Sequence, residues 1–189
     1  ESRNSIETGA LELNEVSVMG TTFESLINYI KSMDETHQFD PLRRLKPLVD
    51  KSDFSAPERF TRDEEEIEVK PQEVLISMTD AKGQITFANE TFHRIAEYEV
   101  GDLKGKPHNV IRHPDMPRTA FADLWATIQQ KKMWEGYVKN ATQHGKYYWV
   151  KAIVFPILEN DKIQGYISVR TRPERHKIQS AIEAYRKLP

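Results

Sequence analysis

The fold is decided by the stretch Val74-Leu75-Ile76-Ser77-Met78, Asp80-Ala81-Lys82-Gly83 and Ile85-Thr86-Phe87. Its first and last parts are apolar runs of the length that is typical of strands. The middle part has Asp at the first position and Gly at the last position of a tight turn. We therefore expect two antiparallel strands joined as a hairpin.

Helices are expected to follow this hairpin. Asn89 can cap a short helix that extends to Tyr98. A second helix is expected to begin near Pro117, since proline is tolerated in the first turn. The apolar residues after Pro117 recur at helical spacing, which gives the helix one buried face. They are Phe121, Leu124, Trp125 and Ile128.

Three further strands are expected over residues 136–141, 147–158 and 163–172. In the last of them Tyr166, Ser168 and Arg170 alternate with apolar neighbours, as in a strand with two different faces. An amphipathic helix is then expected over residues 174–188. The predicted fold class is α+β, with a five-stranded antiparallel sheet and short helices on one face. A cavity suited to a small ligand is expected between the two layers.

The first 71 residues are expected to form a separate helical segment with a charged linker. Phe23, Leu26, Ile27 and Ile30 have helical spacing, whereas the run from Leu11 to Val18 fits a helix or a strand equally well. The acidic run at residues 63–66 is interpreted as a solvated linker rather than an acidic binding site. The predicted organisation is an N-terminal segment (1–71), a central domain (72–172) and a C-terminal helix (173–189).

Composition excludes several kinds of function. The chain has 189 residues, a net charge of -2 and no cysteine. Such a charge predicts no strong attraction to nucleic acid or to an anionic membrane. Without cysteine there is no disulfide, thiolate metal site or cysteine nucleophile. We find no Rossmann glycine motif, Walker loop, metal-ligand spacing or nucleophile triad, so we expect neither an enzyme nor a metal protein. A cytoplasmic location is expected.

The order of the expected elements, together with Asp80-x-x-Gly83-x-Ile85-x-x-x-Asn89, resembles the PAS family. Four more specific motifs, in the same order, resemble those of the PAS domains of the bacterial aerotaxis receptor and related chemotaxis receptors. They are Asn109-Val-Ile-Arg112-His113-Pro114-Asp115-Met116-Pro117, Ala120-Phe121-Ala122-Asp123-Leu124-Trp125, Trp134-Glu-Gly-Tyr-Val-Lys139-Asn140 and Tyr148-Trp149-Val150-Lys151-Ala152. The resemblance extends from about residue 72 to residue 185. It implies the PAS fold and a domain that binds FAD noncovalently and senses oxygen and redox state.

The same resemblance implies which residues bind the flavin. The matched positions are Asn89, Arg112, His113, Asp115 and Trp134, where Trp134 forms a wall of the cofactor cleft. In the aerotaxis receptor the PAS domain begins the chain, whereas here about seventy residues precede it. A different receptor or signalling class is therefore expected, and redox sensing is the part of the function that we carry over.

Plainer roles remain open for several of these residues. Arg112 and Asp115 could form a local ion pair, and His113 could be a hydrogen-bonded loop histidine. The absence of cysteine excludes the cysteinyl–flavin adduct of blue-light LOV domains. Two alternatives to FAD are kept. One is haem, with His108 or His113 as axial ligand. The other is a cofactor-free dimerisation module that pairs through the helix around residues 23–30.

The expected partners are a signalling output domain, in the same chain or in another, and a second copy of the chain. The helix over residues 174–188 is the predicted output lever, because its apolar face must pack against another surface. Candidate output modules are a chemotaxis signalling module, a histidine kinase and a cyclic-dinucleotide domain.

Overall fold

The computed structural model describes residues 11–12, 40–56 and 58–189. A mixed α+β domain has five antiparallel strands in the order β4-β5-β6-β2-β3. The strands are β2 (Leu75–Asp80), β3 (Ile85–Ala88), β4 (Trp134–Ala141), β5 (Tyr147–Glu159) and β6 (Lys162–Thr171). Their order confirms the predicted hairpins at both ends of the domain, with bounds that differ from the predicted ones by a few residues.

The hairpin between β2 and β3 forms for the expected reason. Asp80 Oδ1 accepts hydrogen bonds from the backbone N–H groups of Lys82 and Gln84, each at 2.9 Å. Gly83 has a φ of 83°, a conformation that glycine adopts at little cost. One end of the domain is thus determined by a local turn.

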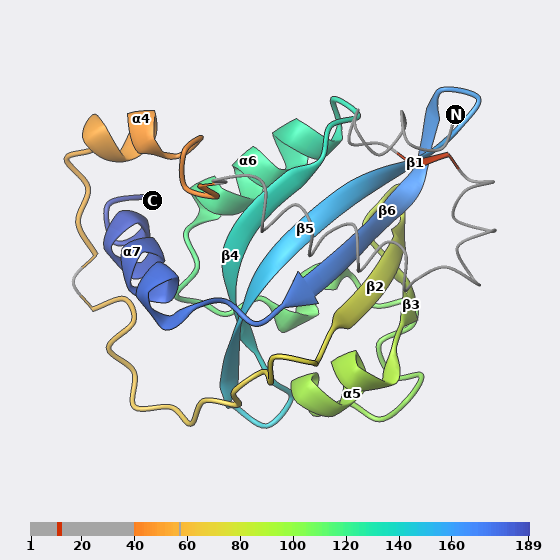
Figure 1. Cartoon of the computed structure of the whole chain (residues 1–189), viewed down its shortest axis with the longest axis horizontal. Coiled ribbons are helices and arrows are strands. Elements are labelled where there is room, and N and C mark those ends of the chain that lie inside the picture. The colour runs from red at the N-terminus through yellow and green to blue at the C-terminus, as the bar shows by residue number, and fades with distance from the viewer. Residues whose placement is uncertain (1–10, 13–39, 57) are drawn as a thin grey trace.

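The helices are α4 (Lys46–Asp50), α5 (Glu90–Ala96), α6 (Arg118–Ile128) and α7 (Arg175–Tyr185), with a 3-10 turn, η2 (His108–Ile111), before α6. Asn89 caps α5 and Pro117 precedes α6, as predicted. Figure 1 shows α7 and the C-terminus beside β4, at the edge of the sheet away from β3.

The sequence did not decide between helix and strand for the run that begins at Leu11. Leu11–Glu12 forms β1, which pairs in parallel with Ile157 and Leu158 of β5, beyond the stretch of β5 that pairs with β4. The predicted N-terminal helix around residues 23–30 lies outside the described residues. In the ranges that are described, none of the helices is both long and apolar enough to cross a membrane.

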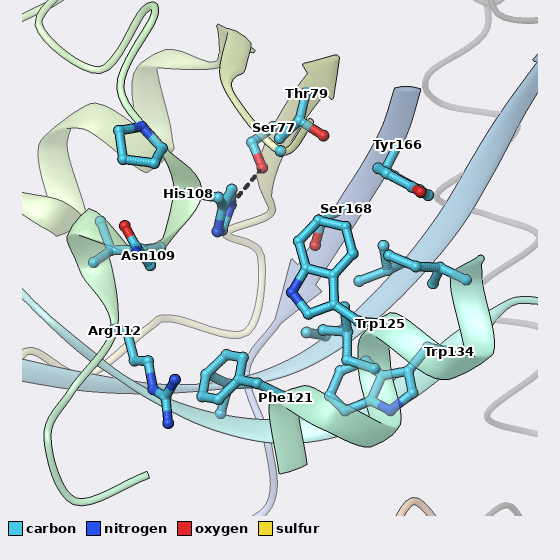
Figure 2. A pocket seen from close by; sticks show the side chains of 18 of the residues that line it. Ser77, Thr79, His108, Asn109, Arg112, Phe121, Trp125, Trp134, Tyr166 and Ser168 are labelled. Carbon is cyan, nitrogen blue, oxygen red and sulfur yellow. Dashed lines mark hydrogen bonds between the residues drawn. The ribbon is translucent and has the colours of Figure 1, made fainter. Parts of the chain in front are cut away.

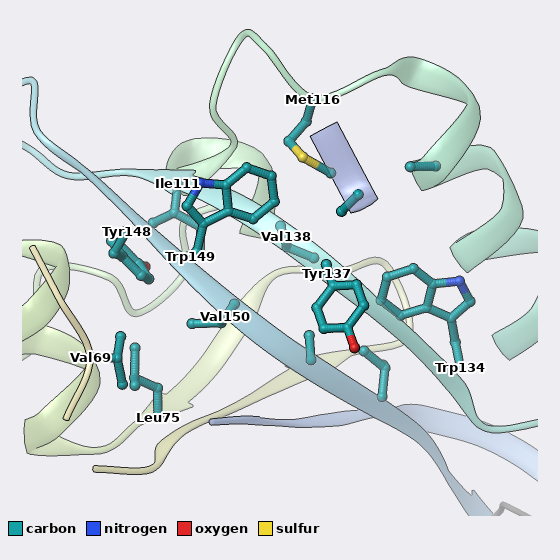
Figure 3. Packing of buried hydrophobic residues seen from close by; sticks show 14 of the residues in the cluster. Val69, Leu75, Ile111, Met116, Trp134, Tyr137, Val138, Tyr148, Trp149 and Val150 are labelled. Atoms are coloured by element: carbon teal, nitrogen blue, oxygen red, sulfur yellow. The ribbon is translucent and has the colours of Figure 1, made fainter. Parts of the chain in front are cut away.

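The main hydrophobic cluster lies around β4 and β5. Figure 3 shows Trp134, Tyr137, Tyr148 and Trp149 along these two strands. Because neighbouring strand residues point to opposite faces, Tyr148 lies on the same face as Asn140 of β4, and Trp149 on the same face as Lys139. The two faces therefore carry different sets of side chains, and this separation determines the site described below.

Candidate functional site

A cavity of about 350 Å³ lies between the sheet and the helices. Its floor is formed by β2, β4, β5 and β6, and its cover by η2, α6 and the loop before η2. The volume is at the lower end of the range of small-ligand pockets, which suits a planar ring system rather than a whole dinucleotide. The labelled wall residues in Figure 2 are Ser77, Thr79, His108, Asn109, Arg112, Phe121, Trp125, Trp134, Tyr166 and Ser168.

Trp134 is held firmly in this wall. Its side chain is 3% exposed, and its indole Nε1 donates a hydrogen bond to Asp123 Oδ2 on α6 at 2.7 Å. The ring lies over Gly136, where a Cβ atom would come within 2.1 Å of it. Glycine at position 136 is therefore required for this orientation of the indole.

Other aromatic rings complete the wall. Trp125 of α6 meets Tyr166 of β6 edge to face, with 5.6 Å between the ring centroids. The Arg112 guanidinium lies 4.1 Å from the centroid of the Phe121 ring, within the range of a cation–π contact. Arg112 Nη2 also donates to the carbonyl of Met116 at 3.3 Å. Burial, with the charges of Arg118 and Arg59, lowers the pKa of Arg112. The cavity thus joins flat aromatic surfaces to a positive group.

A second positive group lies deeper, on β6. Arg170 is 4% exposed, and its Nη1 donates to Ser77 Oγ at 3.0 Å. Its Nη2 donates to His108 Nε2 at 2.6 Å, so the ring proton of His108 belongs on Nδ1. Burial and then the charge of Arg170 lower the pKa of His108 to about 3, and burial lowers the pKa of Arg170 to about 10. His108 is therefore neutral at physiological pH, and Arg170 is charged.

Among the described residues, the lining of the cavity has no negative group to compensate these cations. Across the part of the chain that the structure describes, the lining contains Arg112, Arg170 and Lys82 but neither aspartate nor glutamate. In the same part of the chain, Ser168 Oγ and Asn140 Nδ2 are buried without a hydrogen bond of good geometry. Buried polar groups are normally satisfied, so these atoms are available to a ligand. The arrangement fits a planar ligand with an electron-rich, hydrogen-bonding edge.

Three of the five predicted flavin-binding residues lie elsewhere. Arg112 and Trp134 line the cavity, whereas Asn89, His113 and Asp115 do not. The Asn89 side chain accepts from the N–H groups of Ile76 and Phe92 and donates to the carbonyl of Val74. It ties the start of α5 to β2 and so supports the frame around the cavity.

His113 points to the other face of the sheet because of the pairing of its neighbour. Arg112 is extended and forms an antiparallel bridge with Asn140 of β4. In an extended chain, adjacent side chains point in opposite directions. Arg112 therefore faces the cavity, while His113 reaches the opposite face, where Lys139 lies. The two residues are neighbours in sequence but belong to different sites.

On that opposite face four side chains form what we call the outer cluster: Glu64, His113, Asp115 and Lys139. Lys139 Nζ lies 2.8 Å from Asp115 Oδ2 and 3.4 Å from Glu64 Oε2. His113 Nε2 lies 2.8 Å from Glu64 Oε2, and its Nδ1 accepts from the N–H of Asp115. The predicted alternative of an Arg112–Asp115 ion pair is wrong, since Asp115 pairs with Lys139 and Arg62.

The environment of the outer cluster shifts two pKa values. Burial, then the charge of Lys139, lowers the pKa of His113 against the opposing effect of Glu64 and Asp115. Burial raises the pKa of Asp115, but Lys139, His113 and Arg62 outweigh this and leave it lowered. The carboxylates and His113 are close enough to ligate a cation. The ammonium group of Lys139 already serves as that cation.

Glu64 belongs to a segment, residues 58–69, that we call the strap. Two contacts attach the strap to β5. The backbone N–H of Ile67 donates to the carbonyl of Tyr147, and the Phe60 ring stacks on Trp149. The structure here differs from the solvated linker expected for the acidic run. Its glutamates pair with cations of the domain and of α7, and these pairs are Glu64–Lys139, Glu65–Lys146, Glu66–Arg175 and Glu68–Arg172.

The contact between Arg170 and His108 in the cavity was not predicted from the sequence. No local motif marks them, and 62 residues separate the two. One signal was present, because Tyr166, Ser168 and Arg170 alternate with the apolar residues Ile167 and Val169. A polar stripe at period two on a central strand indicates a lined cavity, but its partner on η2 is found only in the folded chain.

Comparison with known proteins agrees with this fold. Residues 85–170 match the family model described as the PAS fold. The chain is 44% identical to the aerotaxis receptor of Escherichia coli (strain K12) over 114 residues. The aligned part makes up 60% of this chain and 22% of that protein. The chain is 28% identical over 103 residues to a nitrogen fixation regulatory protein of Klebsiella pneumoniae, covering 54% of this chain and 21% of that one. The chain thus spans about a fifth of these relatives.

Solved structures show the same fold at low identity. The light state of the blue-light photoreceptor Aureochrome1 LOV superimposes with a TM-score of 0.52 at 17% identity, covering 56% of this chain and 86% of that one. A structure described as "Flavin Analogue Sheds Light on Light-Oxygen-Voltage Domain Mechanism" has a TM-score of 0.53 at 12% identity, covering 58% and 84%. These likenesses concern the fold alone.

Proposed function

We propose that this chain, whose residues 85–170 form a PAS domain, holds FAD and reports its redox state to a signalling output module. The observation that carries the proposal is the cavity, with its aromatic walls, its two arginines and the absence of acidic side chains from its described lining. An isoalloxazine ring is flat, and its pyrimidine edge carries carbonyl and nitrogen acceptors. Such a ring complements aromatic walls and cationic donors.

The residues that would hold the ring are those that already point into the cavity. Trp134 and Trp125 offer flat surfaces, while Arg112 and Asn140 offer donors at the edge. When bound, a flavin supplies reversible oxidation and reduction. Asn89, His113 and Asp115 would support binding from outside the cavity by fixing the backbone around it.

The relatives support a sensory role rather than catalysis. One is named as a receptor and another as a regulatory protein. The chain spans about a fifth of the curated relatives, so the features of the whole protein are part of the proposal. These features are the output module, the redox or oxygen stimulus, an aerotaxis- or chemotaxis-type pathway, a homodimer and a cytoplasmic location.

The route from the cavity to the output would lead through β4 to α7. The hydroxyl of Tyr185 on α7 donates to the carbonyl of Tyr137 on β4 at 2.6 Å. Trp134 lies on the same strand as Tyr137, and the strap holds α7 through the Glu66–Arg175 pair. A change at the cavity wall can therefore bias the position of α7, with a coupling on the order of 1–3 kcal/mol.

Flavin is favoured over haem by the state of the two histidines. His108 Nε2 already accepts a hydrogen bond from Arg170, and both ring nitrogens of His113 are used outside the cavity. His108 Nε2 and both nitrogens of His113 are therefore already engaged within the chain rather than free to ligate iron. Haem therefore remains an outcome to test rather than a second proposal.

The deciding experiment is an absorption spectrum of the freshly purified protein, followed by release and identification of the chromophore. We expect flavin bands, and FAD rather than FMN on release by heat. A Soret band would replace flavin by haem. A protein that stays colourless after incubation with FAD would overturn the proposal, and a concentration-dependent dimer would then favour the cofactor-free interaction module.

Variants then test the assignment of the site. Arg112→Gln removes the charge over Phe121, and we expect the affinity for FAD to fall about tenfold or more, as for the loss of a charge-assisted contact. Arg118→Gln is the matched control, because this arginine lies six residues away and is exposed. Equal affinities of the two variants would remove Arg112 from the flavin site.

A further inference from the structure

Arg170 is a buried cation that has no counterion among the residues that the structure describes. Across the described residues no carboxylate contacts it, and its side chain donates hydrogen bonds to the neutral groups Ser77 and His108. A cation out of water is costly unless a negative group compensates it, and an apolar residue of similar size is often more stable there. The contact with the Phe92 ring, at 5.0 Å, compensates only part of this cost.

The surroundings orient this cation toward the cavity. Ser77 and His108 use one donor on each terminal nitrogen, and an arginine has five donors in all. Ser168, whose hydroxyl has no partner in the described part of the chain, lies two residues before Arg170 on the same face of β6. Both residues line the cavity, so an entering ligand would meet a charged donor beside a free hydroxyl.

We propose that Arg170, positioned by Ser77 and His108, is the residue that recognises a negatively charged ligand edge in the cavity. This inference rests on the proposed function, in which the ligand is FAD. The edge that Arg170 faces is then the one that gains negative charge on reduction. Arg170 therefore binds the reduced ring more strongly than the oxidised ring, and it raises the reduction potential of the bound flavin.

The first test replaces Arg170 by methionine and compares two quantities. Without flavin, we expect Arg170→Met to melt higher than the wild type by about 3–6 °C, because a buried unpaired charge is removed. Its affinity for oxidised FAD should fall about 10- to 100-fold, the usual loss for a charge-assisted hydrogen bond. Arg172→Met is the control, since Arg172 is half-exposed and pairs with Glu68 outside the cavity.

The second test is a redox titration of the FAD-loaded proteins. If reduced FAD loses about tenfold more affinity than oxidised FAD, the two-electron potential of Arg170→Met falls by about 30 mV. Arg170→Lys, which keeps the charge, should retain most of the wild-type potential.

The outcomes separate the two proposals. A wild type that binds no FAD overturns the proposed function. A wild type that binds FAD no better than Arg170→Met overturns the role of Arg170 alone. A flavin-free Arg170→Met that melts lower than the wild type would make Arg170 a structural residue, and an unchanged potential would overturn its preference for the reduced ring.

Discussion

Arg170 and Lys139 are both buried cations of one sheet, and they are compensated in opposite ways. Lys139, 3% exposed on the outer face, has Asp115 at 2.8 Å and Glu64 at 3.4 Å. Arg170, 4% exposed on the cavity face, has a hydroxyl, a neutral imidazole and an aromatic ring. The chain itself compensates the charge of Lys139, whereas no described carboxylate compensates that of Arg170. This difference is the basis of our proposal that the cavity face, rather than the outer face, binds the ligand.

The largest effect is expected when the outer cation loses its counterion. Asp115→Ala leaves Lys139 buried with only the half-buried Glu64, and we expect a loss of about 3–5 kcal/mol in the free energy of unfolding. Chemical denaturation measures this loss. The double variant Asp115→Ala, Lys139→Met should recover most of it, and a double variant as unstable as the single one would show that the pair is not the cause.

The next largest effect is expected from low pH, which should destabilise the cavity face through His108. The pKa of His108 is about 3 in the folded protein and near 6.5 in the unfolded chain. The unfolded state therefore binds more protons below pH 6.5, and stability is lost as the pH falls from 6.5 toward 3. One histidine contributes at most about 1.4 kcal/mol per pH unit.

The wild type and His108→Gln are compared by denaturation from pH 7 to pH 4.5. The variant should show a shallower loss, and the part that remains is expected from His113, whose pKa is also lowered. Identical slopes in the two proteins would contradict the neutral His108 that the cavity requires.

A smaller change should act on the cavity wall alone. Gly136→Ala places a Cβ atom where the Trp134 ring now lies, so the indole must move. We expect a cost of about 1–3 kcal/mol in the free energy of unfolding, as for other overpacked sites. Weakened FAD binding should accompany it, measured by the fluorescence of released flavin.

The smallest effect is expected at the strap. Glu64→Gln keeps the size of the side chain but removes a charge that faces Lys139 and His113, and we expect a loss of about 1 kcal/mol. Faster hydrogen exchange of residues 62–67 should report the loosened strap. Glu65→Gln, whose partner Lys146 is at the surface, should leave exchange nearly unchanged.

Much of the fold could be predicted because its determinants are local. The turn at Asp80 and Gly83, the cap at Asn89 and the helix after Pro117 each depend on residues within a few positions. The aromatic wall was predicted in part, since Trp134 belongs to a recognisable motif. The strap was not predicted, because an acidic run has the same composition whether it is solvated or paired.

The hairpin turns and the alternation of polar and apolar residues could be derived from the sequence alone, because they follow from neighbouring residues and the period of a strand. The order of the strands in the sheet could not, because β2 pairs with β6, which lies far away in the sequence. The folded structure was needed to establish that Arg112 faces the cavity while His113 joins Lys139, because the pairing of Arg112 with Asn140 determines which way each side chain points. It also decided that Lys139 has counterions from the strap and the loop before α6, while Arg170 has none in the described chain. Electrostatic compensation depends on residues far apart in sequence, so it is established only when the chain has folded.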